Sequence, residues 1–488
     1  MGDRLPHWLL GVILLLVAQG AAAAPGLTAT LEPVWDGHFL PGRATEVRVH
    51  LLAESGGRFE LALQSGSGRT RYRGILEAGT PQDLWLPLIP DPGAPVALTL
   101  WRDGERVLQQ NLWFTASPAP LTISVQPLAP ELPVDSASST LSSRVDGLPR
   151  TGDGYRGVGR LVLPLELLPR LDRQQMAALR DYIGDCGMLL MSGGGANLLQ
   201  RIKGIAGCNG EYIGITGRYS AAGPASAPAP APAANPNAEP AHGWNDPIAL
   251  FFAVYLVSLL LIAATWRRPA ALLAAPLLGT LGLLLFWPLQ DNPVQLVSWA
   301  EMQSGSANVR YSALLRIVGN RGEQNRRISL SSRLGMPGVE NAMPLDIRFD
   351  ALRPGLQSLV TQVRPFSRYD YRFQGSLPAP FRLRLELSDN SPRVTNRSDT
   401  ETPAGLLSWN QEIYALPALP PGQSWSPTGS ERIDGRGDPA QRLRQRAGSA
   451  RAALLLPMTL QDAGLIAPDS GIDRLQGWLL VRPAGGLS

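Results

Sequence analysis

The sequence predicts a multidomain membrane protein: an N-terminal β-sandwich, a small α/β domain with a parallel sheet, a two-helix transmembrane hairpin and a C-terminal, mostly β region. Three observations predict this fold class. Short runs of alternating apolar and polar residues fill both ends of the chain, strand and helix patterns alternate between about residues 120 and 220, and two long apolar runs lie between these regions. With 488 residues, the chain is long enough for two to four domains.

Residues 1–23 have the features of an export signal. Arg4 supplies a basic start, the run LLGVILLLV at 9–17 is a short apolar core, and the alanines ending at Ala23 supply small residues for cleavage. The apolar core is short for a membrane span. We therefore expect a signal peptide that is cleaved near Ala23, with an uncleaved anchor as the alternative.

Residues 26–117 have the pattern of strands. Segments such as ATEVRVHLLAE, RFELALQSG and APVALTLWRDG alternate apolar and polar residues, with Gly, Pro and Asp between them. Several short strands separated by frequent turns are typical of a β-sandwich.

Residues 120–220 change to alternating strands and helices. LTISVQPL, GRLVLPLELL and GMLLMS are apolar strand candidates, and Asp172 can cap a helix through RQQMAALRDYIG that Gly184 can end. Strand, helix, strand, helix predicts a parallel α/β layer. The Ala/Pro-rich stretch at 221–244 predicts an extended linker after this domain.

Two apolar runs, 247–266 and 269–289, predict a transmembrane hairpin over 247–289. Each has about 20 residues without a charge, the length that a bilayer core of about 30 Å requires. Arg267 and Arg268 lie between the runs, and positive residues stay cytoplasmic. We therefore expect a bacterial inner-membrane protein with this turn in the cytoplasm, both flanking regions in the periplasm and the lipid bilayer as a partner.

Residues 292–488 again favour strands. NVRYSALLRIVG, RRISLSSRLG and FRLRLELSDNS alternate well, and the segment beginning DPAQRLRQR is more helical. The pattern predicts a mostly β periplasmic domain.

The only two cysteines, Cys186 and Cys208, are candidates for a catalytic thiol or a disulfide. Gly184-Asp185-Cys186-Gly187 resembles a nucleophile turn, but Cys186 follows a helix and precedes a strand, the reverse of a nucleophile elbow. None of the four histidines lies within 120–220 to act as its base. A strand followed by a returning helix brings both cysteines to one edge, so we favour a Cys186–Cys208 disulfide, with two separate thiols as the alternative.

The opposite edge carries Ser192, Gly193, Gly194 and Gly195, where a strand ends and a helix is expected to begin. Ligands bind at this edge of open α/β sheets, and free N–H groups at a helix start can hold an anion. The stretch lacks the residues of a P-loop or a dinucleotide fingerprint, so a tight structural turn is the main alternative.

The charge pattern and residue usage argue against several function classes. The net charge is only +4, and its arginines form no dense basic stripe, so we expect no nucleic-acid partner. Asp153, Asp172, Asp181 and Asp185 lack the spacing of a calcium loop. We therefore expect no bound metal and no cofactor.

Two stretches resemble a loose group of bacterial inner-membrane proteins that join a periplasmic β-sandwich to a degenerate class I glutamine-amidotransferase-like domain. Residues 31–51, with Trp35, Gly37, Pro41 and Gly42, look like their first strand pair, and residues 170–195 are similar to their helix-strand-glycine element. The resemblance implies an amidotransferase-like fold without its catalytic set. It also implies association with MoxR-type AAA+ ATPases or ABC-transport components.

Three functions fit this organisation. The first is a non-enzymatic, membrane-anchored scaffold, sensor or accessory subunit with protein partners in the cell envelope. The second is a hydrolase or amidotransferase-like enzyme acting at the Gly193–Gly195 edge, with help from residues such as Ser192 or Asp153. The third is an accessory component of a transporter. The absence of a recognisable catalytic constellation favours the first.

Overall fold

Strands dominate the protein in a computed structural model that describes most residues outside 1–25 and 217–292. Two α-helices, α2 (Arg173–Gly184) and α6 (Asp438–Ala447), lie in this part of the chain. The residues described are 26–125 except 67, 140–192 except 186, 213–216, and 293–483 except 307, 320–323, 340–344, 351–354, 365–366, 389–390, 434–436 and 448–449.

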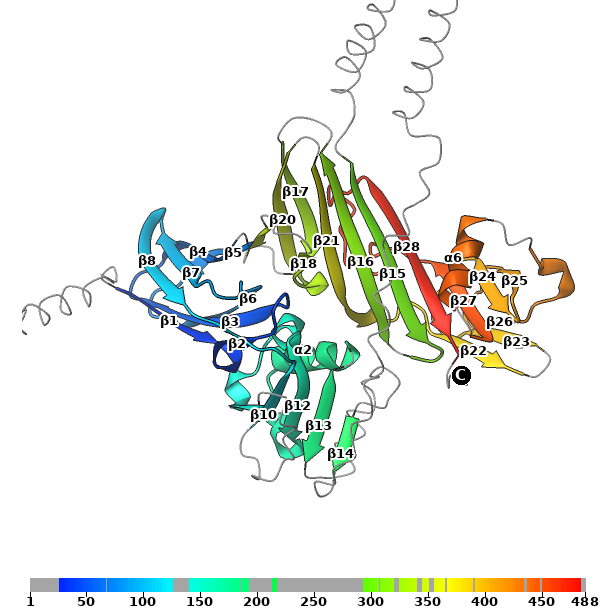
Figure 1. Ribbon diagram of the computed structural model, residues 1–488, viewed down its shortest axis with the longest axis horizontal. Coiled ribbons are helices and arrows are strands. Elements are labelled where there is room, and N and C mark those ends of the chain that lie inside the picture. The colour runs from blue at the N-terminus through cyan, green and yellow to red at the C-terminus, as the bar shows by residue number, and fades with distance from the viewer. Residues whose placement is uncertain are drawn as a thin grey trace, which may run out of the picture.

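The N-terminal strands form a β-sandwich (Figure 1). One sheet has the order β1-β3-β6, and the facing sheet contains β5-β4-β7-β8. Alternate residues of the strands, among them Val47, Val49 and Leu61, are buried between the two layers. The strands are β1 (Leu27–Pro33), β3 (Thr45–Ala53), β4 (Gly57–Ser65), β5 (Gly68–Leu76), β6 (Gln82–Leu88), β7 (Val96–Arg102) and β8 (Glu105–Leu112).

The second layer of this sandwich continues into the C-terminal half of the chain. β5 pairs in parallel with β19 (Leu345–Asp350), which leads to β20 (Leu356–Val363) and β17 (Gln324–Ser331). The result is one seven-stranded sheet in the order β17-β20-β19-β5-β4-β7-β8. The N-terminal and C-terminal β regions therefore share a sheet, whereas the sequence pattern treats them as separate domains.

A five-stranded parallel sheet lies beside the sandwich, in the order β11-β10-β12-β13-β14. Asp172 caps α2 by accepting the N–H groups of Gln174 and Gln175, and the Gln175 side chain accepts the N–H of Asp172 in return. This capping box begins the helix at the position that the sequence predicts. The strands are β10 (Leu121–Val125), β11 (Thr140–Ser143), β12 (Val158–Pro164), β13 (Met188–Ser192) and β14 (Ile213–Thr216).

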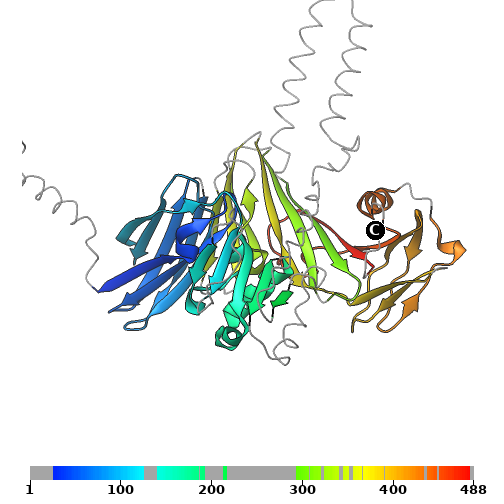
Figure 2. The same ribbon diagram turned by 60° about the horizontal axis from the view of Figure 1, so that its bottom comes forward.

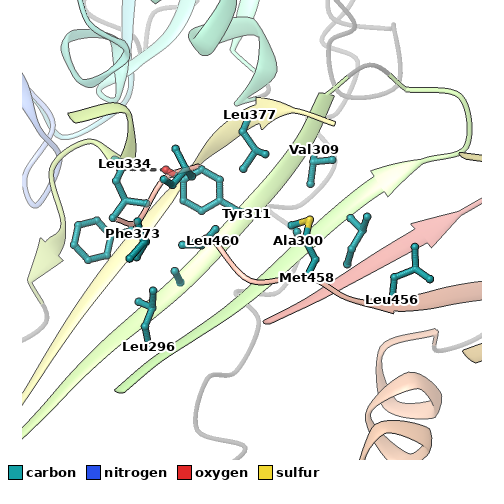
Figure 3. Close-up of a cluster of buried hydrophobic side chains, with 14 of the residues drawn as sticks. Leu296, Ala300, Val309, Tyr311, Leu334, Phe373, Leu377, Leu456, Met458 and Leu460 are labelled. Atoms are coloured by element: carbon teal, nitrogen blue, oxygen red, sulfur yellow. Dashed lines mark hydrogen bonds between the residues drawn. The ribbon is translucent and has the colours of Figure 1, made fainter. Parts of the chain in front are cut away.

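An eight-stranded sheet forms most of the C-terminal region, in the order β18-β21-β16-β15-β28-β27-β24-β25. Figure 3 shows part of its core, where Tyr311 and Phe373 lie among aliphatic side chains. α6 packs on β24 and β27 through Leu443. The strands are β15 (Val294–Gln303), β16 (Asn308–Gly319), β18 (Gly338–Val339), β21 (Ser367–Pro378), β24 (Gly405–Trp409), β25 (Glu412–Leu416), β27 (Ala452–Pro457) and β28 (Arg474–Arg482).

Short elements complete the described fold. A parallel pair joins β2 to β9, and a small antiparallel sheet has the order β22-β23-β26. Six 3₁₀ helices connect the strands of the described part. The bounds are β2 (His38–Phe39), β9 (Thr115–Ala116), β22 (Leu383–Leu387), β23 (Pro392–Asn396), β26 (Ser424–Trp425), η1 (Val34–Gly37), η2 (Val145–Gly147), η3 (Gly152–Tyr155), η4 (Leu165–Arg170), η7 (Ser332–Leu334) and η8 (Gly429–Glu431).

The fold class predicted from the sequence is wrong in its membrane component. No helix in the described part of the chain is long and apolar enough to cross a membrane. α2 and α6 have 12 and 10 residues and carry charged side chains. At a rise of 1.5 Å per residue they are about 18 and 15 Å long, well short of a bilayer core of about 30 Å.

The inner-membrane localisation built on the predicted hairpin is corrected by the same finding. The described chain is mostly β, and a topology with periplasmic ends and a cytoplasmic turn is not supported. The run 247–289, with Arg267 and Arg268 at its turn, lies outside the described residues, as do the predicted signal at 1–23 and the linker at 221–244.

Candidate functional site

The site predicted on the parallel sheet is described only at its start. Ser192 ends β13, and in the register of the sheet it pairs with Pro164 of β12 and Thr216 of β14. The carboxyl ends of these strands thus meet at one edge, as expected for a parallel sheet. Gly193, Gly194 and Gly195 lie outside the described residues.

The two cysteines also lie outside the part of the chain that the structure describes. The Cys186–Cys208 disulfide therefore stays a prediction. Asp185, which precedes Cys186, is the C-cap residue of α2, so a helix precedes position 186, as the sequence analysis expects.

A loop of the α/β region, from Arg150 to Arg156, is the centre of the polar contacts between the three β layers. The loop contains η3 and lies beside β3 of the sandwich on one side and the C-terminal sheet on the other. Figure 2 shows the sandwich, the parallel sheet and the C-terminal sheet meeting in this part of the molecule. We call the loop and its contacts the junction.

Glu46 of β3 joins the sandwich to this loop. Its side chain is fully buried, and one carboxyl oxygen, Oε2, accepts the backbone N–H of Arg150 at 3.2 Å. The other oxygen, Oε1, accepts the hydroxyl of Thr151. Burial raises the pKa of Glu46 to about 8, and the nearby Asp153 charge also raises it, whereas the hydrogen bonds lower it. Glu46 is therefore mostly protonated at neutral pH.

Asp153 and Arg156 join the same loop to the C-terminal region. Both carboxylate oxygens of Asp153 accept the backbone N–H of Met336, at 3.0 and 3.1 Å. The Arg156 Nε lies 2.8 Å from Asp153 Oδ1, and its two terminal nitrogens donate to the carbonyls of Met336 and Gln374. These bonds give the largely buried ion pair backbone partners in the C-terminal region.

Gly335 allows this close approach. Its φ of 72° favours glycine, and a Cβ placed there would lie 2.5 Å from Arg156 Nη2 and 2.8 Å from Asp153 Oδ1. A side chain at this position would push the ion pair apart.

Aromatic side chains fill the apolar part of the junction. The Trp35 indole N–H donates to the carbonyl of Gly154 at 2.8 Å, across the boundary between the sandwich and the loop. Tyr155 lies between two rings, with centroids 5.8 Å from Trp35 and 5.2 Å from Tyr182 of α2. Burial raises the pKa of Tyr155 well above its usual value, so its phenol stays neutral.

Two further acids lie near the end of α2, next to the C-terminal sheet. Burial against that sheet raises the pKa of Asp181 and of Asp185 to about 6, and neighbouring carboxylates add to the effect. The carboxyl groups are partly desolvated, but both residues are exposed at the surface, so water screens their charges. Arg333 opposes the shift at Asp181, and Arg156 and Arg310 oppose it at Asp185.

The junction residues were missed by reasoning from the sequence. Glu46 lies in an alternating strand, Thr45–Ala53, where a carboxylate is expected to face water. The signal that could have found the loop is the run TGDGYRG at 151–157, in which an acid, a base and a tyrosine lie between glycines. Trp35 stands in the stretch that carries the family resemblance, and its contact with Gly154 gives that residue a structural role.

Chemically, the junction holds segments together. The buried side chains of Glu46, Asp153 and Arg156 are bonded to backbone groups of other segments, and none of the three lines either cleft described for this part of the chain. No group of three or more His, Cys, Asp or Glu residues that could hold a metal ion occurs in the ranges described.

One cleft, of about 460 Å³, lies between the sandwich and the α/β region. It is lined by Arg48, Val145, Asp146, Arg150, Leu167, Arg170, Asp172 and Gln175. We call it the arginine cleft. The sequence analysis did not predict it, because its residues come from four separate segments.

Comparison with known proteins adds no relative. No family model matches the chain, and no curated protein matches its sequence.

Proposed function

We propose that the protein is a non-enzymatic scaffold or accessory subunit, a rigid body that holds binding surfaces of several segments in a fixed arrangement. The observation that carries this proposal is the junction. Glu46, Asp153 and Arg156 form hydrogen bonds with backbone groups of segments far apart in the chain.

The shared sheet supports the same function. β5 and β19 pair through six residues each, which ties the N-terminal sandwich to the C-terminal region by a backbone ladder. Obligatory backbone pairing of this kind leaves little freedom for hinge motion between the two regions. A scaffold requires such rigidity, because it presents partners at fixed distances.

Affinity capture of the tagged full chain from its own cells, followed by mass spectrometry, tests the proposal. We expect at least two partner proteins in constant proportion to the chain. In cells that lack the chain, those partners should no longer be captured with one another. Recovery of the chain alone, or partners that stay associated without it, would contradict the scaffold function.

A further inference from the structure

The arginine cleft has the construction of a ligand site. Its walls come from β3 of the sandwich (Arg48), from η2 (Val145 and Asp146), from η4 (Leu167 and Arg170) and from the start of α2. A volume of about 460 Å³ is within the range of small-ligand pockets. Sites of this kind occur preferentially where two domains meet.

One wall of the cleft is held rigidly. Asp172 Oδ1 accepts the N–H groups of Gln174 and Gln175, and its Oδ2 lies 2.9 Å from Arg150 Nη2. The Gln175 amide donates to the carbonyl of Val145 at 2.7 Å. The helix start, η2 and the Arg150 side chain are thus fixed relative to one another, as a preorganised site requires.

Trp85 positions two of the three arginines. The guanidinium of Arg48 lies 5.7 Å from the Trp85 ring centroid, and that of Arg150 lies 5.4 Å from it. The Nε atoms of both arginines and the Trp85 indole nitrogen are buried without a hydrogen-bond partner within the described chain. These three nitrogens are shielded from solvent and Trp85 does not line the cleft, so they are not the donors that a ligand in the cleft would meet.

The charges in and around the cleft are partly compensated. Arg48 pairs with Asp83 at 2.8 Å and with Glu32 at 3.4 Å, and Arg150 pairs with Asp172. Two charged groups that line the cleft, Arg170 and Asp146, form no salt bridge with a described residue, although the charge of Asp146 also acts on Arg48. A ligand that complements this arrangement brings one anionic group and one donor.

From this pairing we infer that the arginine cleft binds an α-carboxylate whose neighbouring carbon carries an N–H donor and an apolar side chain. The carboxylate would accept from Arg170 and from the remaining N–H groups of Arg150, because a guanidinium fork matches a carboxylate geometrically. The N–H would donate to Asp146. Val145 and Leu167 would cover the apolar side chain.

Two sources share this chemistry: the C-terminal residue of a peptide and a free amino acid. The inference goes beyond the scaffold function and does not depend on it, because binding is measured on the purified chain alone.

The test is calorimetric titration of the full chain with three probes: acetyl-Ala-Ala-Leu with a free carboxylate, the same peptide as its C-terminal amide, and L-leucine. We expect the peptide acid to bind. The amide should bind at least about tenfold more weakly, since it lacks the charge-assisted bonds. Binding of the peptide acid identifies a C-terminus as the source, and binding of leucine alone identifies a free amino acid.

Arg170→Ala and Arg173→Ala form a matched pair of variants. Arg170 lines the cleft, whereas Arg173 lies three residues further on and does not. Both side chains are exposed, so both variants should fold, which thermal unfolding checks. We expect about a tenfold loss of affinity for Arg170→Ala and no change for Arg173→Ala.

Three results would overturn the inference. They are equal binding of acid and amide, equal effects of the two variants, and absence of binding by both the peptide acid and leucine at millimolar concentrations. Tighter binding of inorganic phosphate than of either carboxylate would also overturn it, because the cleft would then be a phosphate site.

Discussion

Replacing Glu46 by glutamine should make the protein less sensitive to alkaline pH. Glu46 is fully buried, and its pKa in the folded protein is about 8, compared with 4.5 for an exposed glutamate. A glutamine has nearly the shape of the protonated acid. Its carbonyl can accept the N–H of Arg150, and its amide can donate to the Thr151 hydroxyl, so the bonds of the junction are kept.

The sign of the effect follows from proton binding. Because the pKa is higher in the folded state, the folded protein retains a proton that the unfolded chain has lost between pH 4.5 and about 8. The free energy of unfolding is therefore greatest below this window and falls as the pH rises through it. Between pH 6 and pH 9 the loss due to Glu46 is about 2–3 kcal/mol, at 1.36 kcal/mol for each pH step below the folded pKa.

Urea unfolding at pH 6 and pH 9, followed by tryptophan fluorescence, measures this loss. Between the two pH values, the free energy of unfolding should fall by about 2–3 kcal/mol more in the wild type than in Glu46→Gln. Asp181 and Asp185 titrate equally in both proteins and cancel in the comparison. Glu77→Gln, at an exposed position of the same sandwich, is the matched control and should follow the wild type. An equal loss in the wild type and in Glu46→Gln would refute the reasoning.

Two further substitutions test the packing of the junction and the C-terminal sheet. Asp153→Asn leaves Arg156 buried without its counter-ion and should lower the free energy of unfolding by about 3–5 kcal/mol in urea titrations. The exposed Asp399→Asn is the control and should change this free energy little. Similar losses in both variants would speak against the ion pair. Gly477→Ala places a Cβ 2.0 Å from the backbone carbonyl oxygen of Met458, so the thermal midpoint of unfolding should fall. In the control Gly338→Ala the nearest atom, the carbonyl oxygen of Arg372, is 3.8 Å from the added Cβ, so the midpoint should not change. Equal midpoints in the two variants would show that the sheet adapts to the added Cβ.

Local patterns predict several elements correctly. Asp172 and Gly184 mark the start and end of α2, because a side-chain cap and a helix stop act within one turn of the chain. The alternation in Thr45–Ala53 predicts a strand, and the structure has β3 there. Patterns of this kind depend only on neighbouring residues, so the sequence carries them directly.

The candidate sites could be predicted only in part. The sheet edge at Ser192 follows from the order of strands and helix, whereas Glu46 gives no local sign of its burial, since its neighbours alternate as in any half-exposed strand. The arginine cleft combines Arg48 with Arg150 and Arg170, which only the tertiary structure brings together. The membrane component of the predicted fold class is a different error. It rests on hydropathy alone, whereas no helix in the described part of the chain is long and apolar enough to cross a membrane.

The sequence by itself determined strands such as β3 and where α2 begins and ends. Only the tertiary structure decided that β5 pairs with β19, and that Glu46 is enclosed by the loop containing Arg150 and Thr151. The physical reason is the range of the forces involved. Propensity, alternation and capping act over a few residues, whereas burial and the pKa shift that it causes depend on which distant segments exclude water from a side chain.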